Sequence, residues 1–185
     1  NRLVKMCPFS GHYYSIHDYK LKNIYSEEYN NVNYTDVGGV QKEFEIIINL
    51  TEKLSDNKMR VKNINNFFQH HKIENKFGLD VGSGIGVFPY EMKKTDWNIE
   101  VVDPDINSVN HISNLMGIKC YHTYFENLNT KSKFDLITFN KVIEHVRDPL
   151  SFLKLSQSFI KENGYVYIEV PDGTTASIYG QSRNE

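Results

Sequence analysis

The chain has 185 residues, enough for a single domain that buries roughly two-thirds of the surface of its unfolded form. Its 21 Lys and Arg against 23 Asp and Glu give a net charge of −2, without the clustered positive charge that nucleic-acid binding usually needs. No apolar run reaches the roughly 18 residues of a membrane span, and Cys7 and Cys120 form neither a disulfide framework nor a zinc-ligand spacing. We therefore predict a cytoplasmic protein without a membrane or nucleic-acid partner.

The first 39 residues differ in character from the rest. They hold six of the 12 tyrosines and many asparagines, and their apolar residues show little periodicity. We predict an irregular, aromatic-rich arm or cap over residues 1–39, followed by one domain over residues 40–185. That domain opens with two helices, over 40–54 and 59–70, where apolar residues recur at helical spacing, and residues 55–58 form the turn between them.

Short hydrophobic runs alternate with amphipathic segments from residue 76 onward. Asp148 followed by Pro149 favours a helix start, and Gly117 and Gly164 stand where helices should stop. Strands alternating with helices indicate a parallel sheet covered on both faces, a doubly wound α/β fold. We predict strands over 76–81, 99–103, 119–125, 134–140 and 164–170, and helices over 85–94, 107–116 and 149–161.

Three closely spaced glycines, Gly82, Gly84 and Gly86, follow the first of these strands. They do not fit the G-x-G-x-x-G turn that receives a dinucleotide pyrophosphate, since a third glycine would fall at Val87 or Pro89. Asp80 lies just before the turn, where a carboxylate would repel a pyrophosphate and attract an ammonium or sulfonium. The turn therefore predicts a positively charged ligand, such as S-adenosylmethionine.

The segment "LDVGSGIG" resembles the D-x-G-x-G-x-G signature of class I S-adenosylmethionine-dependent methyltransferases. The resemblance continues, in the family's order, through "IEVVDPD", "YHTYFENL", "FDLITFNKVIEHVRDP" and "ENGYVYIEVPD", and covers residues 76–172. In motif the chain is most similar to the ubiquinone-pathway O-methyltransferase-like group. The resemblance implies a Rossmann-like sheet, and because the chain stops soon after its fifth strand we expect it to lack the last two strands of that sheet.

The resemblance also implies a cofactor site. Asp103 ends the second strand, 23 residues after Asp80, where an acid can accept hydrogen bonds from ribose hydroxyls. After the third strand, Tyr124 and Phe125 would contact adenine by stacking or through the backbone, although Phe125 could equally belong to the core. The predicted cofactor-binding residues are Asp80, Gly82, Ser83, Gly84, Gly86, Asp103, Pro104, Tyr124, Phe125, Glu126, Asn140 and Lys141, the last two at the methionine end.

The candidate general bases are His145, in "VIEHV", and Asp172, just past the fifth strand, although either could merely stabilise a loop. Some of the relatives have E-V-[IL]-E-H here and hold a divalent metal with both Glu residues and the His. This chain has Lys141 in place of the first Glu. A cation among metal ligands is unfavourable, so we predict no metal.

These features predict methyl transfer from S-adenosylmethionine to a small-molecule acceptor, at an oxygen of a sugar, a polysaccharide precursor or a quinone-like metabolite. Two alternatives stay open: an RNA-directed methyltransferase and a non-catalytic cofactor-binding module. The N-terminal tyrosines would line an acceptor pocket, form a dimer contact or pack on the outer helices; they are Tyr13, Tyr14, Tyr19, Tyr25, Tyr29 and Tyr34. The fifth strand would be left as an open hydrophobic edge, which folded proteins normally cover or pair. We therefore expect that the sequence is shortened, that another subunit, as in a homodimer, covers this edge, or that N-terminal residues do.

Overall fold

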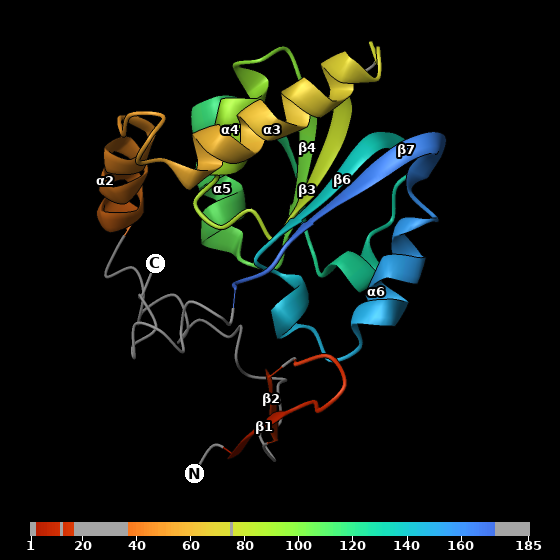
Figure 1. Cartoon of the computed structure of the whole chain (residues 1–185). Helices are drawn as coiled ribbons and strands as arrows, with labels where there is room; N and C mark the ends of the chain where they lie inside the picture. The colour runs from red at the N-terminus through yellow and green to blue at the C-terminus, as the bar shows by residue number, and fades with distance from the viewer. Residues whose placement is uncertain (1–2, 12, 17–36, 75, 173–185) are drawn as a thin grey trace.

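The computed structural model describes residues 3–11, 13–16, 37–74 and 76–172 (Figure 1). Its centre is a parallel five-stranded sheet in the order β5-β4-β3-β6-β7. The strands are β3 (Phe77–Val81), β4 (Asn98–Asp103), β5 (Lys119–His122), β6 (Phe134–Asn140) and β7 (Ile160–Glu169). The doubly wound α/β prediction is confirmed, and within the described residues the sheet ends at β7.

Helices cover both faces of this sheet. Figure 1 shows α6 on one side and α3 and α4 on the other, with α2 at the periphery. The helices are α2 (Val37–Ile48), α3 (Asp56–His70), α4 (Val87–Lys93), α5 (Ile106–Met116) and α6 (Pro149–Ser156), with short 3-10 helices η2 (Phe125–Asn127) and η3 (Ile143–His145). The predicted turn over 55–58 lies slightly earlier, because Ser55 caps α3 by accepting a hydrogen bond from the Lys58 N–H.

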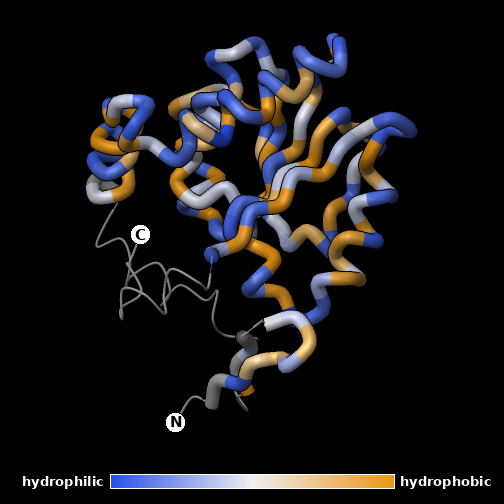
Figure 2. Tube along the Cα trace, viewed as in Figure 1, coloured by the Kyte–Doolittle hydropathy of each residue, from blue (hydrophilic) through white to orange (hydrophobic). Residues whose placement is uncertain are grey.

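The hydrophobic core consists of two layers, one on each face of the sheet, because successive side chains along a strand point to opposite faces. On the α6 face, Leu79, Ile137 and Phe139 pack with Phe125 and Phe152. On the other face, β4 contributes Ile99 and Val101 against α5, and α3 and α4 pack over β6 and β7. Figure 2 shows the apolar segments along the strands and on the helices that cover them.

Two predicted boundaries on either side of residue 160 are wrong. The helix predicted over 149–161 ends at Ser156, and β7 begins at Ile160 rather than at residue 164. Gly164 therefore stops no helix. It lies at an irregularity in the β6–β7 pairing, where an added Cβ would come within 2.9 Å of the Phe134 carbonyl oxygen. By contrast Gly117 does end α5, in a left-handed conformation with φ 59°.

The N-terminal region contains one regular element that the sequence did not suggest. Strands β1 (Leu3–Met6) and β2 (Tyr13–Ile16) form an antiparallel hairpin. Of the tyrosines singled out above, Tyr14 is exposed, and Tyr19, Tyr25, Tyr29 and Tyr34 lie outside the described residues. The roles proposed for this arm therefore stay predictions.

Candidate functional site

Most of the predicted site residues lie at or just beyond the carboxyl ends of the parallel strands. That edge is where open α/β sheets bind ligands. Hydrogen bonds bring the ends of three neighbouring strands together: Asp80 of β3 bonds to Asn140 of β6, and Asp103 of β4 bonds to Gly84 in the turn after β3. Side chains predicted from separate motifs thus form one site.

The three glycines of the turn do different things. All have positive φ, +70° at Gly82, +52° at Gly84 and +83° at Gly86, a region that L side chains rarely adopt. A Cβ at Gly82 would lie 2.8 Å from Val142 Cγ2, and one at Gly86 would lie 2.5 Å from Ile112 Cγ1, so both are needed for packing. A Cβ at Gly84 would meet nothing within 4 Å. Only Gly84 therefore exposes the open backbone surface expected for ligand approach.

Asp80 is buried and accepts hydrogen bonds from three side chains, two on β6 and one in the turn. Its Oδ1 accepts from Thr138 Oγ1 at 2.6 Å and from Asn140 Nδ2 at 3.1 Å, and its Oδ2 accepts from Ser83 Oγ at 2.6 Å. Burial raises the pKa of Asp80 to about 6, against the opposing effect of these hydrogen bonds. Asp80 thus organises the turn directly, through its hydrogen bond to Ser83 and its two hydrogen bonds to β6.

Asp103 holds the other side of the turn. Its Oδ2 accepts from the Gly84 N–H at 3.2 Å, and its Oδ1 accepts from the Asp105 N–H at 2.8 Å. Burial raises the pKa of Asp103 to about 6, and the negative charges of Asp105 and Asp80 add to that rise. Two carboxylates thus converge on one turn, an arrangement that favours a cationic ligand.

The end of β6 supplies a further polar group. Asn140 Oδ1 is buried and has no hydrogen-bond partner among the described residues. A buried acceptor of this kind costs free energy unless a donor reaches it. Lys141, the next residue, has a left-handed backbone with φ 55°, which for a non-glycine residue marks a constrained position.

The residues after β5 divide between site and core. The Thr123 N–H donates to the Asp103 carbonyl, so Tyr124 follows immediately beside the Asp103 strand end, and its side chain is 44% exposed. Glu126 is also exposed. Phe125 points the other way: it is 3% exposed, and its ring packs against Phe139 and Phe152. The core interpretation therefore holds for the Phe125 side chain.

Pro104, one of the predicted cofactor-binding residues, precedes the Asp105 cap of α5, and its carbonyl accepts from His122 Nε2 at 3.1 Å. Asp105 caps the helix through the N–H groups of Asn107 and Ser108. The turn from β4 into α5 is thus held both by Asp103 and by its own cap.

The candidate bases lie on loops at this same edge. His145 is in η3, its side chain 60% exposed and its Nε2 4.0 Å from Glu144 Oε1. Asp172 follows β7 and is exposed. Neither side chain is packed into the core, so both are accessible to a molecule approaching the sheet edge.

A cluster that was not predicted from the sequence joins α3 to β7. The guanidinium of Arg60 binds both carboxylate oxygens of Glu169, through Nε at 2.7 Å and through Nη2, and Tyr167 Oη donates to Glu169 Oε2 at 2.9 Å. The Arg60 hydrogen bond is the main reason that the pKa of Glu169 is lowered. The positive charge of Arg60 also acts on Asp80. The sequence did contain an indication of this cluster, because the charged residue Arg60 lies beside the apolar residues of α3.

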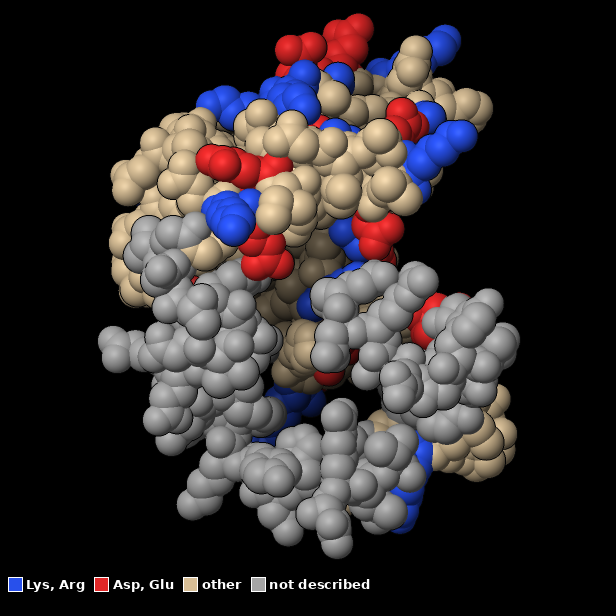
Figure 3. Space-filling view, turned by 90° about the vertical axis from the view of Figure 1, so that its left-hand side faces the viewer, with Lys and Arg blue, Asp and Glu red and all other residues tan. Residues whose placement is uncertain are grey.

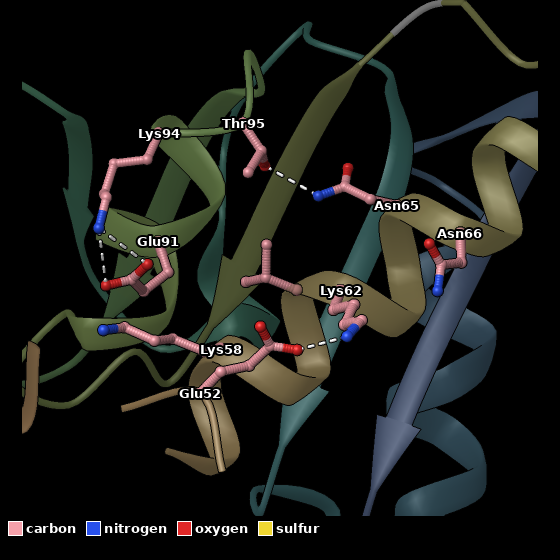
Figure 4. A pocket seen from close by; sticks show the side chains of 9 residues that line it. Glu52, Lys58, Lys62, Asn65, Asn66, Glu91, Lys94 and Thr95 are labelled. Carbon is pink, nitrogen blue, oxygen red and sulfur yellow. Dashed lines mark hydrogen bonds and ion pairs between the residues drawn. The ribbon is translucent and has the colours of Figure 1, made fainter. Parts of the chain in front are cut away.

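A separate pocket of about 480 Å³ lies between α3 and α4 (Figure 4). Its charged groups pair among themselves, Lys62 with Glu52 and Lys94 with Glu91. None of the predicted site residues lines it. Figure 3 shows acidic and basic side chains interspersed over the described part of the face that it views, without a broad patch of one sign.

No helix in the described part of the chain is long and apolar enough to cross a membrane. In the same part of the chain, no group of three or more His, Cys, Asp or Glu side chains is placed to hold a metal ion.

Comparison with known proteins gives the family. The family model described as "Methyltransferase domain" matches residues 50–183. A curated relative, the ubiquinone biosynthesis O-methyltransferase of Hydrogenovibrio crunogenus, is 28% identical over 118 residues, which is 60% of this chain and 48% of that protein. The chain thus spans about half the length of this relative.

Solved structures share the fold. A S-adenosylmethionine-dependent methyltransferase from Clostridium acetobutylicum has a TM-score of 0.62 at 20% identity, covering 74% of this chain and 59% of its own. The plantazolicin methyltransferase BpumL, solved with a triazolic desmethylPZN analog and S-adenosylhomocysteine (SAH), has a TM-score of 0.64 at 13% identity, covering 78% of this chain and 57% of its own.

The parallel sheet, the glycine turn and the two converging carboxylates define a class I methyltransferase fold. The chain belongs to the methyltransferase-domain family, within the class I enzymes that use S-adenosylmethionine.

Proposed function

We propose that this chain binds S-adenosylmethionine and transfers its methyl group to an oxygen of a small molecule. The observation that carries the proposal is the convergence of Asp80 and Asp103 on a turn whose only open glycine is Gly84. Anionic groups around an accessible backbone suit an adenosine compound with positive charge, and they disfavour a pyrophosphate.

The residues present fit this cofactor along its length. Tyr124 and Glu126 would lie by the adenine, and Asp103 would accept hydrogen bonds from the ribose hydroxyls. Gly84 would leave room for the chain between ribose and sulfur. The buried Asn140 Oδ1 and the charge of Asp80 would favour the ammonium group at the methionine end. Gly82, Ser83 and Gly86 would act indirectly, by shaping the turn.

The bound cofactor would supply a methyl group already activated by its sulfonium. What the protein adds is position: donor carbon and acceptor oxygen must be aligned at about 3 Å. His145 would take the proton that the hydroxyl loses, contributing about 10²- to 10⁴-fold, with Asp172 as the second candidate. One O–C bond forms as the C–S bond breaks, and the proton goes to the imidazole.

The acceptor is proposed to be a sugar, a polysaccharide precursor or a quinone-like compound. The curated relative is named for O-methylation in ubiquinone biosynthesis, which supports an oxygen acceptor. The interspersed surface charge in Figure 3 and the net charge of −2 give no support to an RNA substrate.

Calorimetric titration with S-adenosylmethionine, SAH and NAD tests the cofactor, and a screen with radiolabelled methyl groups over sugars, phenols and RNA tests the acceptor. We expect binding of the first two compounds and labelling of a hydroxylated small molecule. Cofactor binding without any transfer would favour the non-catalytic module. Binding of NAD alone would contradict the proposal.

A further inference from the structure

We propose that Thr138 is a positioning residue whose hydroxyl keeps Asp80 ionised and oriented, and so sets the pH range in which the cofactor binds. Thr138 is completely buried, so it acts through Asp80 and not by touching the cofactor. The inference rests on the proposed function and adds a residue that was not predicted from the sequence.

The place of Thr138 in the sheet is fixed by its strand. It lies within β6, directly opposite Asp80 of β3 and Tyr167 of β7 in the pairing of these parallel strands. Residues two positions apart in a strand point to the same face, so Thr138 lies between Leu136, which packs in the core, and Asn140, at the strand end. Because β6 is paired on both sides, the Thr138 side chain keeps this position whether or not a ligand is bound.

The hydroxyl of Thr138 is used to bind Asp80. A valine of nearly the same shape would suit the apolar interior, and a buried hydroxyl costs free energy unless it is hydrogen-bonded. Thr138 Oγ1 donates to Asp80 Oδ1 at 2.6 Å, whereas its distance to the Leu79 carbonyl oxygen is 3.5 Å. The single hydroxyl proton therefore goes to the carboxylate.

Three side chains donate to the Asp80 carboxylate, and Thr138 is the most deeply buried of them. Asn140 shares Oδ1 with Thr138, and Ser83 donates to Oδ2. Ser83 and Asn140 are partly exposed, in the turn and at the end of β6, where the proposed cofactor would reach them. The bond from Thr138 is therefore the one that a bound cofactor can neither replace nor displace.

The surroundings of Asp80 disfavour its negative charge. Burial raises its pKa, and the Asp80 charge acts on Asp103 of β4, a second buried carboxyl, so ionisation of either opposes ionisation of the other. The three hydrogen bonds oppose the effect of burial, because they bind the ionised form. Without the Thr138 hydroxyl, Asp80 would thus ionise at a higher pH.

The positive charge of Arg60 does not replace this hydroxyl. The Arg60 guanidinium, on α3, binds both carboxylate oxygens of Glu169 on β7. Its charge favours the ionised form of Asp80, but less than each of the three hydrogen bonds does. On α4, the helix that follows the turn, Glu91 pairs with Lys94. The ionisation of Asp80 therefore depends mainly on neutral donors.

The test compares two substitutions that separate the hydroxyl from the methyl group. Thr138→Val removes the hydroxyl and keeps the shape, whereas Thr138→Ser keeps the hydroxyl and removes the methyl group. Affinity for S-adenosylmethionine is measured by calorimetry between about pH 5 and about pH 8, and in the wild-type protein it should fall as Asp80 and Asp103 become protonated. The midpoint of this fall should move up by about one pH unit in Thr138→Val, as for a lost hydrogen bond to a charged group, and stay in place in Thr138→Ser.

Ser156→Ala is the matched control. It removes another buried hydroxyl, which donates to the Leu153 carbonyl within α6, and should leave the midpoint at the wild-type value. Circular dichroism checks that each variant is folded. If Thr138→Val does not fold, Thr138→Ala, which also lacks the hydroxyl, takes its place and should show the same shift.

An unchanged midpoint in the folded variant without the hydroxyl would overturn the inference while leaving cofactor binding intact. An equal shift in Thr138→Ser or in Ser156→Ala would overturn it too, since the effect would then come from packing or from the loss of any buried hydroxyl. So would a wild-type affinity that does not change over this pH range. A wild-type protein that binds no S-adenosylmethionine at any of these pH values would instead defeat the proposed function itself.

Discussion

Asp80 and Asp103 are buried carboxyl groups with a pKa raised by burial to about 6. In the unfolded chain an aspartate titrates near 3.8, so between these values the folded protein binds more protons. The stabilising effect of these groups is present below about pH 4 and is lost as the pH rises through 6. Their ionised forms, which the proposed cofactor site requires, are therefore maintained at a cost in stability.

Asp103→Asn should separate binding from stability. The substitution removes a buried charge but leaves one N–H group without its acceptor, so we expect the free energy of unfolding at pH 7.5 to rise by about 1 kcal/mol. Affinity for S-adenosylmethionine should fall at least about tenfold, as for a lost hydrogen bond to a charged group. Urea denaturation and calorimetry measure the two effects.

The pH dependence is the control for this substitution. The stability difference between Asp103→Asn and the unaltered protein should shrink as the pH falls from 7.5 to 4, where the carboxyl is protonated in the folded protein. If the difference in free energy of unfolding between the two proteins stays constant over this pH range, burial of the Asp103 charge is not the cause of that difference.

Gly84 and Gly86 offer a matched pair within one turn. Gly86→Ala would bring a Cβ within 2.5 Å of Ile112 Cγ1, and we expect it to destabilise the fold by about 3 kcal/mol. Gly84→Ala meets no atom within 4 Å and should cost only about 1 kcal/mol. Its effect should instead be a loss of cofactor affinity. Thermal denaturation with cofactor titration checks both variants, and unchanged affinity in Gly84→Ala would place the cofactor elsewhere.

At the scale of elements, the ion pair between Arg60 and Glu169 connects α3 to the end of β7. Arg60→Met leaves a partly buried carboxylate without its main partner, and we expect a loss of about 2 kcal/mol in the free energy of unfolding. Because the pKa of Glu169 is lowered by Arg60, the stabilisation is present above the usual glutamate range and is lost as the pH falls through the lowered value.

Urea denaturation at pH 7 and pH 3 measures this effect. Lys62→Met, which removes the exposed pair with Glu52 from the same helix, is the control and should destabilise the fold much less than Arg60→Met. A similar loss in both variants would mean that the α3–β7 connection contributes no more than a surface ion pair.

The elements show which features could be predicted from the sequence. The strand over 134–140 was predicted correctly because its apolar run is bounded on both sides. Gly164 was misassigned because a glycine after a helical pattern looks the same whether it ends a helix or approaches a neighbouring carbonyl. The bonds of Thr138 to Asp80 and of Arg60 to Glu169 join residues 58 and 109 positions apart, and no local pattern predicts such pairs.

At the scale of the whole molecule, β7 is the strand on which association between copies would depend. In the part of the chain that the structure describes, its only strand neighbour is β6. Val166 and Ile168 are 38% and 43% exposed on one face of this strand, and Val170, just after it, is 51% exposed. Unpaired backbone groups beside apolar side chains form a template for strand pairing.

We therefore expect the 185-residue chain to self-associate through β7 and Ile168→Lys to weaken that association, because a charged side chain there opposes edge-to-edge pairing. Stability should change by no more than about 0.5 kcal/mol, as for other surface substitutions. Leu150→Lys is the control: this side chain is 70% exposed, but it belongs to α6 and offers no backbone edge. Sedimentation velocity over a concentration series measures the association. Equal weakening by both substitutions would indicate general hydrophobic contact, and no weakening by Ile168→Lys would place any interface away from β7.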